Sequence, residues 1–361
     1  MSFLIVENLR KTYPDGTPAV KGVSLEINAG EFIVLLGPSG CGKTTTLRML
    51  AGLETPTGGR VLLAGQDITQ FRPGQRDVGF VFQFYALYPH LTVAQNIAFP
   101  LENRKFNKQD CRKKVQAIAR HMGLESLLKL HPGQLSGGDQ QRVALARAMV
   151  RQPRLYLMDE PLGTLDADLR LTLREYIREQ QTESGVTTIY VTHDQEEAMA
   201  LADRIVVMRA GEVCQVDVPE KVYEAPDDLF VAHFVGSPGM NIVEAILRKT
   251  DHHYEVVTPD GSARFTLPIV GNLQPASDRQ TWGIRPEYLS IGEVGPVTGT
   301  VVLVERLGAF AYVYADTAWG RLAAMTGPDV GLSPGEIIRL TPDPAHLHWF
   351  DTSTGKRVDR L

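Results

Sequence analysis

The segment GPSGCGKTT, residues 37–45, is the feature that most limits how this chain can fold. It follows the short apolar run EFIVLL (31–36), which predicts a buried strand, and it opens KTTTLRMLAGL (43–53), whose apolar spacing predicts a helix. A glycine-rich turn between a strand and a helix presents backbone N–H groups and the helix N-terminus to an anion. The pattern G-x-x-x-x-G-K-T in this context predicts a loop that binds a nucleoside triphosphate.

Individual residues of this loop have distinct expected roles. Lys43 is placed to reach the β- and γ-phosphates of the nucleoside triphosphate, and the hydroxyl of Thr44 to ligate Mg²⁺. The other residues that we expect around the phosphates are Gly37, Pro38, Ser39, Gly40, Cys41, Gly42 and Thr45. A glycine-rich turn without a ligand is the alternative, but the complete motif favours nucleotide binding.

Two adjacent carboxylates end the apolar run LYLMDE, residues 155–160. Asp159, at the carboxyl end of a strand, is suited to hold Mg²⁺ through water, as the partner acid of a phosphate-binding loop does. Glu160, one residue later, is suited to orient or deprotonate a water molecule. The alternative for Glu160 is an acid that only begins a helix before Pro161.

The segment LSGG (135–138) begins a predicted helix that continues to Val150. Ser136 is expected to be its N-cap, with Asp139 as the partner in a capping box. Neither residue explains the two glycines, Gly137 and Gly138, which leave the backbone open to the approach of another group.

Three single polar residues are candidates of lower specificity. Gln83 follows the apolar run VGFVF and is suited to contact Mg²⁺ or the attacking water, whereas His193 follows the strand TTIYVT. Tyr13, in RKTYPDG, is suited to stack on adenine. Taken singly, each residue is more typical of a structural position.

The arrangement of apolar segments predicts two domains. Buried strands at 31–36, 154–160 and 187–194 alternate with helices, including one that follows Asp166, and this pattern favours a mainly parallel sheet. The stretch from about 93 to 150 is mostly helical. Beyond GSPGMN (236–241), short strands and frequent turns favour a small barrel-like domain. We therefore expect domains at 1–236 and 237–361.

Composition limits the partners, the cysteine chemistry and the compartment that we expect. The formal net charge is −5, so we expect no nucleic-acid partner held by bulk electrostatics. The three cysteines, Cys41, Cys111 and Cys214, are far apart, which argues against a disulfide framework or a zinc site. We find no signal peptide and no apolar window long enough for a membrane span, and we expect the chain in the cytosol.

The motifs occur in one order along the chain, and together they resemble the ATP-binding subunit of an ABC transporter. The resemblance is strong over about residues 3–235. Segments 78–101, 190–208 and 236–241 are similar to the importer ATPases typified by the maltose transporter ATPase. WGIRPEYLSIG (282–292) is similar to the regulatory domain of that group, so the likeness extends more weakly to the end of the chain.

The resemblance implies a fold and an activity. The fold would be an α/β P-loop ATPase of ABC type with a helical subdomain at about 90–150, followed by an all-β, OB-like regulatory domain. Two protomers, identical or closely related, would enclose two ATP molecules in a head-to-tail dimer. Ser136, Gly137 and Gly138 of each protomer would cover the γ-phosphate of the ATP bound to the other protomer. Asp166 would lie at the dimer seam, Glu160 would be the general base, and His193 would position phosphate and water.

The resemblance also implies partners. Two transmembrane permease subunits would receive the dimer at the cytoplasmic face of the inner membrane, where it would be peripheral, and an extracytoplasmic solute-binding protein would act indirectly. Gln83 would link the nucleotide to the permease. The aromatic run FQFYALYPH (82–90) suits either a surface that receives a helix or ordinary core. The expected solute is a sugar, a polyol or glycerol 3-phosphate.

Two other functions fit parts of the sequence. A soluble ABC ATPase of translation usually carries two ATPase units, and one of DNA maintenance separates its motifs with a long coiled coil. In this chain Lys43 and Ser136 lie in one short unit, which disfavours both. A P-loop small-molecule kinase would not explain LSGG or the barrel-like tail.

Two segments depart from the family pattern. Asp139 stands where the family usually has Gln, and Gly163 and Thr164 stand where it has Ser and Asn. We expect Asp139 to favour the helix N-terminus electrostatically but to place a negative charge near the nucleotide. Both departures fall at the expected dimer interface.

Overall fold

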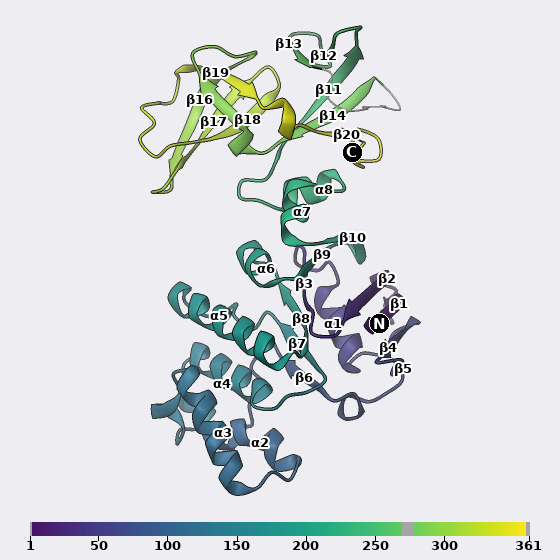
Figure 1. Cartoon of the computed structure of the whole chain (residues 1–361), viewed down its shortest axis with the longest axis vertical. Coiled ribbons are helices and arrows are strands. Elements are labelled where there is room, and N and C mark those ends of the chain that lie inside the picture. Colours follow the sequence, from purple (N-terminus) through teal and green to yellow (C-terminus); the bar gives the residue numbers. More distant parts are fainter. Residues whose placement is uncertain (1, 269–277, 359–361) are drawn as a thin grey trace. The chain divides into compact units, whose positions relative to one another are not determined.

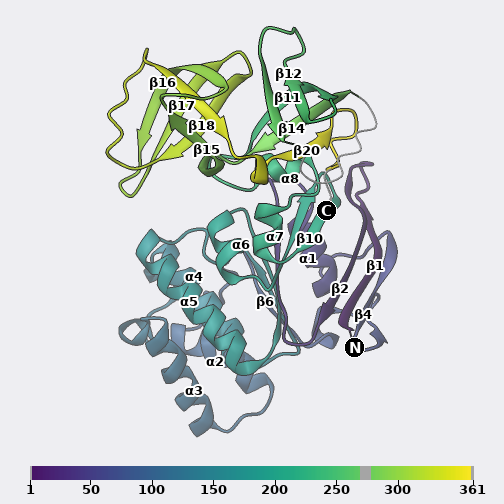
Figure 2. The ribbon, with the colours of Figure 1, turned by 45° about the horizontal axis from the view of Figure 1, so that its top comes forward.

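The computed structural model describes residues 2–268 and 278–358 of the chain. These residues divide into two compact units, with the division between Pro219 and Glu220 (Figures 1 and 2). The division falls earlier than the change of sequence texture near Gly236. The segment between this division and Gly236 forms two short helices, α7 (Pro219–Glu224) and α8 (Leu229–Phe234).

The first unit is built on a six-stranded sheet with the order β10-β9-β3-β8-β7-β6. All neighbours are parallel except β10 and β9, which confirms the parallel sheet expected from the sequence. Its strands are β3 (Phe32–Leu36), β6 (Val78–Val81), β7 (Leu155–Asp159), β8 (Thr187–Thr192), β9 (Arg204–Arg209) and β10 (Glu212–Asp217). Every residue of β3, β7 and β8 is buried, as expected for parallel strands covered on both faces.

A second, antiparallel sheet covers this unit on one side, and the sequence patterns above did not predict it. Its order is β2-β1-β4-β5, formed by β1 (Ser2–Thr12), β2 (Pro18–Asn28), β4 (Gly58–Leu63) and β5 (Gln66–Asp67). One hydrophobic core joins both sheets and includes Leu47 and Leu50 of α1 (Lys43–Ala51). This burial fixes the helix that begins at the glycine-rich loop.

Helices account for most of the stretch that the sequence predicted to be helical. They are α2 (Val93–Asn103), α3 (Lys108–His121) and α4 (Gly137–Met149). In Figures 1 and 2 they gather at the end of this unit away from β1, β2 and β4. Two further helices pack near the parallel sheet, α5 (Ala167–Ser184) and α6 (Gln195–Leu201).

The second unit contains two five-stranded antiparallel sheets. One has the order β13-β12-β11-β14-β20, formed by β11 (Asn241–Lys249), β12 (His253–Val257), β13 (Arg264–Pro268), β14 (Arg279–Ile284) and β20 (His348–Asp351). The other has the order β15-β19-β16-β17-β18, formed by β15 (Leu289–Gly292), β16 (Val297–Arg306), β17 (Ala311–Thr317), β18 (Gly320–Thr326) and β19 (Ile337–Pro342). One core joins them, in which Phe265, Trp282 and Trp319 meet edge to face.

Candidate active site

Four parallel strand ends bring the candidate residues to one edge of the sheet. Strands β3, β8, β7 and β6 are neighbours in that order, so their carboxyl ends meet. The glycine-rich loop follows β3, His193 follows β8, Asp159 ends β7, and Gln83 lies just after β6. The carboxyl edge of an α/β sheet is where ligands generally bind. Residues far apart in the sequence therefore form one site.

The glycine-rich loop has a shape that excludes side chains at two positions. A Cβ at Gly37 would lie 2.3 Å from the carbonyl oxygen of Met208, and one at Gly42, where φ is 101°, would lie 2.5 Å from that of Ala19. Lys43 is almost fully buried, and its Nζ donates to the carbonyl oxygens of Gly37 and Pro38 at 2.6 and 3.1 Å. Two neutral carbonyl oxygens thus hold its ammonium group at the loop.

Thr44 and Asp159 form the part of the site that suits a metal ion. Thr44 Oγ1 donates to Asp159 Oδ1 at 2.9 Å. Burial raises the pKa of the Asp159 carboxyl, more than the hydrogen bond from Thr44 lowers it. A buried carboxylate beside a hydroxyl would be compensated by a hard cation, and oxygen ligands of this kind are those that Mg²⁺ prefers. The residues therefore fit the ion expected from the sequence.

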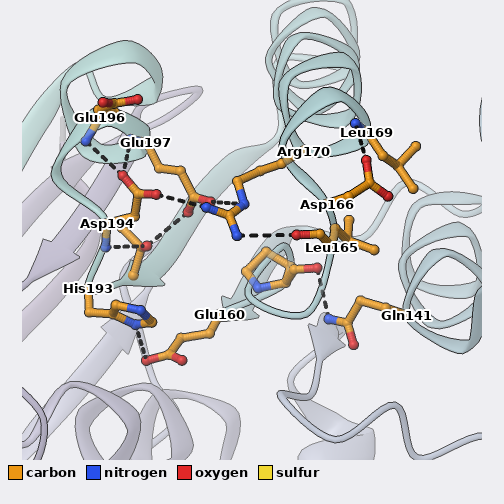
Figure 3. A network of polar contacts seen from close by, with 12 residues as sticks. Gln141, Glu160, Leu165, Asp166, Leu169, Arg170, His193, Asp194, Glu196 and Glu197 are labelled. Carbon is orange, nitrogen blue, oxygen red and sulfur yellow. Dashed lines mark hydrogen bonds and ion pairs between the residues drawn. The ribbon is translucent and has the colours of Figure 1, made fainter. Parts of the chain in front are cut away.

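Glu160 is held between two side chains that the sequence singled out. Gln83 Nε2 donates to Glu160 Oε2 at 3.1 Å, and His193 Nδ1 lies 3.2 Å from Glu160 Oε1. The His193–Glu160 contact is visible in Figure 3. Glu160 has a φ of 46°, a left-handed conformation that costs on the order of 1 kcal/mol for a non-glycine residue and is frequent at functional sites. The Glu160 carboxylate thus lies between Gln83 and His193 at the carboxyl edge of the sheet.

Tyr13 lies beside the first turn of α1. Its hydroxyl is 3.4 Å from Thr45 Oγ1, and the ammonium of Lys11 lies 5.3 Å from the centre of its ring. The ring is thus next to the phosphate loop, as a residue that contacts the base of a bound nucleotide would be. Stacking on adenine stays a prediction.

Ser136 caps α4 as the sequence predicted. Ser136 Oγ accepts from the Asp139 backbone at 3.1 Å and donates to Asp139 Oδ2 at 2.6 Å. The other carboxylate oxygen of Asp139 pairs with Arg142, one turn further along the helix. Burial raises the pKa of Asp139, but the hydrogen bonds from Ser136 and Arg142 together lower the pKa by more than burial raises it. The carboxyl is therefore ionised and paired. Arg142 therefore offsets part of the negative charge that the sequence places near the expected nucleotide.

The glycines of this turn have close neighbours within the same chain. A Cβ at Gly137 would lie 3.0 Å from the hydroxyl of Tyr85, and one at Gly138 would lie 3.4 Å from Leu165 Cδ2. Tyr85 is held in place because Arg147 Nη2 donates to its carbonyl oxygen at 3.2 Å. The segment after Gln83 thus lies against the turn that carries Ser136.

Asp166 is the N-cap of α5, where its carboxylate accepts from the Leu169 backbone at 2.9 Å. The loop between Glu160 and Asp166 is fixed at both ends (Figure 3). Gln141 Nε2 donates to the Pro161 carbonyl at 2.8 Å, and Arg170 Nη2 donates to the Leu165 carbonyl at 3.2 Å. Helices α4 and α5 therefore both hold the loop that follows the candidate base.

Sequence reasoning missed several residues of this site, among them Tyr85, Gln141, Arg147 and Arg170. One signal was present for Arg170. It lies in the first turn of a helix, where a cation is disfavoured by the helix dipole unless other groups hold it. For the other three, partners lie 20 or more residues away in the sequence, and no local pattern predicts them.

Known proteins resemble both units. Residues 20–163 match the model of the ABC transporter family, and residues 282–350 match that of the TOBE domain. The sn-glycerol-3-phosphate import ATP-binding protein UgpC 2 of Agrobacterium fabrum is 42% identical over 360 residues, which cover 99% of this chain and 95% of the relative. The chain belongs to the ABC transporter ATP-binding proteins.

Other comparisons agree with this ABC ATPase assignment. The trehalose import ATP-binding protein SugC of Mycobacterium tuberculosis H37Rv is 45% identical over 391 residues, covering 99% of this chain and 98% of the relative. The dimeric ATP-binding cassette MJ0796 in a post-hydrolysis state with ADP and phosphate is 34% identical, with a TM-score of 0.57. The match covers 60% of this chain and 98% of the MJ0796 chain. The fold expected from the sequence, an ABC ATPase followed by an all-β, OB-like domain, is confirmed, and so is the ATPase class.

No helix within residues 2–268 and 278–358 combines the length and apolar character needed to cross a membrane.

Proposed function

We propose that this ABC ATPase is one of two protomers that power the uptake of a sugar, a polyol or glycerol 3-phosphate. The observation that carries the proposal is similarity along the full chain to import ATP-binding proteins, which include those named for glycerol 3-phosphate and trehalose. The class of solute rests on these relatives alone, because the site described above is built for a nucleotide.

ATP would bind first to the residues of one protomer. The loop Gly37–Gly42 offers backbone N–H groups and the N-terminus of α1 to the phosphates. Lys43 Nζ, now shared between two neutral carbonyl oxygens, can turn one of its three donors to the β- and γ-phosphates. Thr44 and Asp159 would hold Mg²⁺, which supplies positive charge beside the phosphate oxygens when bound. Tyr13 would contact the adenine ring.

Glu160 would accept the proton of the attacking water. As the water oxygen bonds to the γ-phosphorus, the bond from phosphorus to the oxygen of the β-phosphate breaks, and ADP and phosphate are formed. Gln83 and His193 each contact one carboxylate oxygen of Glu160, which restricts its orientation. Glu160 is therefore positioned before the substrate arrives, and this saves the entropy of orienting it during the reaction.

A second protomer would complete the site. Ser136, Gly137 and Gly138 begin α4, so they offer a hydroxyl, an open backbone and a helix N-terminus to a γ-phosphate held by the partner. Asp166, at the start of α5, would lie at the seam. The dimeric state of the related cassette bound to ADP and phosphate supports this arrangement.

A groove beside β6 and α2 would receive a helix of a permease subunit. Its volume is about 660 Å³, and its walls include Phe80, Phe82, Tyr88 and Phe99. Phe84, close by in the sequence, is 79% exposed. A groove lined by aromatic side chains, with an exposed aromatic residue nearby in the sequence, is suited to bind the apolar face of a helix. Gln83 lies in this segment and contacts Glu160, so the segment connects the groove with the base.

The assembled transporter would place the two protomers at the cytoplasmic face of the inner membrane, bound to two permease subunits. A solute-binding protein on the other side would act through the permease. We assign the ATPase to residues 1–236 and a regulatory role to residues 237–361.

Co-purification tests this proposal most directly. The tagged full-length chain should bring two membrane proteins with it from detergent-solubilised membranes. After reconstitution into vesicles, its ATP hydrolysis should rise when solute and solute-binding protein are added. Purification with ribosomes or DNA and without membrane proteins would contradict the proposal and favour a soluble ABC ATPase.

A further inference from the structure

Arg170 occupies a position where its charge is unfavourable unless other groups hold it. It lies in the first turn of α5, four residues after the N-cap Asp166, and a cation there opposes the helix dipole. Its side chain is 35% exposed, so it lies mostly within the protein and does not simply extend into water. The groups that hold it are therefore informative.

The guanidinium of Arg170 joins two loops of the active site (Figure 3). Nη2 donates to the carbonyl oxygen of Leu165 at 3.2 Å, and Nη1 donates to Asp194 Oδ2 at 3.3 Å. Leu165 immediately precedes Asp166 in the loop after Glu160, and Asp194 immediately follows His193. One planar group thus links the loop of the expected dimer seam to the loop that carries His193.

The Asp194 end of this link is firmly anchored. Asp194 Oδ1 caps α6 by accepting from the backbones of Glu196 and Glu197 at 2.8 and 3.2 Å. The Glu197 side chain is 4% exposed and accepts from the hydroxyls of Tyr190 and Thr192, which lie in β8, at 2.8 Å each. Asp194 is therefore attached to both α6 and the central sheet.

The link also has room to tighten. Arg170 Nε is buried and makes no hydrogen bond within the described residues. It lies 3.9 Å from Glu197 Oε1, beyond hydrogen-bond distance. A small shift of the loop 161–166 can therefore bring Nε to Glu197 or draw Nη1 away from Asp194. A guanidinium with an unused buried donor has more than one satisfactory arrangement of its hydrogen bonds.

We infer that Arg170 is a positioning residue that transmits the position of the Leu165–Asp166 loop to His193. In this structure His193 contacts Oε1 of Glu160, the candidate base, and Gln83 donates a hydrogen bond to Oε2. Each of these oxygens keeps a further lone pair that can accept the proton of water, so the position of His193 decides how that lone pair is directed. Contact of a second protomer with the Asp166 loop would change this position through Arg170 and Asp194. This inference rests on the proposed dimeric ATPase.

A double-mutant cycle tests the inference in the full-length protein. Arg170→Gln should lower kcat for ATP hydrolysis by about tenfold to about a hundredfold, the range that misplacement of a catalytic group produces, with KM for ATP changed far less. Because Arg170 acts through His193, Arg170→Gln should add little to the loss caused by His193→Ala. If the two losses multiply in the double variant, Arg170 acts independently of His193 and the inference is wrong.

Two further variants separate positioning from general damage. Arg174→Gln, one turn later on α5, should leave kcat near the wild-type value. Arg170→Lys keeps the charge near Glu197 but lacks the planar fork that reaches both Leu165 and Asp194, so its kcat should fall as well. If Arg170→Gln lowers the unfolding temperature, Arg170→Lys takes its place in the cycle with His193→Ala. Losses that multiply in that cycle would also overturn the inference.

The proposed dimer is tested separately in the same series. Glu160→Gln should form a dimer with ATP, detected by size-exclusion chromatography. If this variant binds ATP and does not dimerise, the proposed function fails and the inference fails with it. If the dimer forms and the losses of Arg170→Gln and His193→Ala multiply, only the inference fails.

Discussion

The imidazole of His193 and the carboxylate of Glu160 are 3.2 Å apart, between Nδ1 and Oε1. The two residues follow neighbouring parallel strands, β8 and β7, so the sheet itself brings them together. His193 is 60% exposed, whereas Glu160 is only 20% exposed. The candidate base is therefore mostly buried, whereas the imidazole beside it is largely open to solvent.

The enclosed position of Glu160 leads to a prediction about Glu160→Gln. The amide keeps the shape and one acceptor oxygen for Gln83, but it cannot accept a proton from water. We expect steady-state hydrolysis to fall by about 10²–10⁴-fold, as is typical for loss of a general base, with ATP affinity retained. Hydrolysis is measured by phosphate release and binding by a fluorescent ATP analogue. Hydrolysis at the wild-type rate would show that Glu160 is not the base.

Much of this site could be predicted from the sequence because its residues follow strands that are recognisable locally. The apolar runs before Gly37, Asp159 and His193 are short, which predicts buried strands of a parallel sheet, and all three strands are buried in the structure. Once the strands are parallel, their carboxyl ends must meet. The N-cap Ser136 could be predicted as well, because a cap depends on residues within one turn.

The rest depends on contacts that no local pattern encodes. Strand β1 pairs with β2 and β4 with irregular register, including a shift between Val6 and Leu9, which obscures the alternation of an antiparallel sheet. The hydrogen bond from Gln141 to Pro161 and that from Arg170 to Asp194 join positions 20 and 24 residues apart. Whether such side chains meet is decided by how helices pack, which the sequence does not show directly.

A second prediction concerns Arg285, a cation in the interior of the C-terminal unit. It is 1% exposed, lies over the Tyr223 ring at 3.5 Å, and its Nη1 donates to the Val235 carbonyl at 2.6 Å. Arg285→Gln should lower the free energy of unfolding of this unit by on the order of 3 kcal/mol, because buried carbonyl groups lose charged donors.

Tryptophan fluorescence during urea unfolding measures this effect selectively. All three tryptophans, Trp282, Trp319 and Trp349, belong to the core of the C-terminal unit. Arg321→Gln is the control, because Arg321 and its partner Asp316 are both more than half exposed and such surface pairs contribute little. Equal unfolding curves for Arg285→Gln and Arg321→Gln would contradict the prediction.

A third prediction follows from the pKa of Asp351. Hydrogen bonds from the Ser353 side chain and from Thr354 lower this pKa to about 2, from an ordinary value of 3.8. A carboxyl with a depressed pKa stabilises the folded state above its unfolded pKa, and this contribution is lost as pH falls from about 4 to about 2. The unfolding temperature of Asp351→Asn should therefore decline less than that of the wild type across this window. Parallel declines would show that the turn does not depend on the charge.

The last prediction concerns Asp139→Gln, which restores the residue usual in the family. The Ser136 hydroxyl donates to Asp139 at 2.6 Å, so it must leave this charged acceptor before it can donate to a γ-phosphate on the partner. A neutral amide is a weaker competitor for that proton. We expect the variant to lower the ATP concentration for half-maximal hydrolysis by up to about fivefold, which corresponds to roughly 1 kcal/mol.

The salt dependence of hydrolysis distinguishes this cause from charge repulsion between Asp139 and the nucleotide. Repulsion at a distance would be screened, so the difference between variant and wild type would shrink as salt is raised from about 0.05 to about 0.5 M. Competition for the Ser136 proton acts at contact, and Arg142 already pairs with the Asp139 charge, so the difference should persist. The measurement is ATP hydrolysis by the assembled transporter over a range of ATP concentrations at each salt concentration. A half-saturation value for Asp139→Gln that equals or exceeds that of the wild type at low salt would show that Asp139 serves only as part of the helix cap.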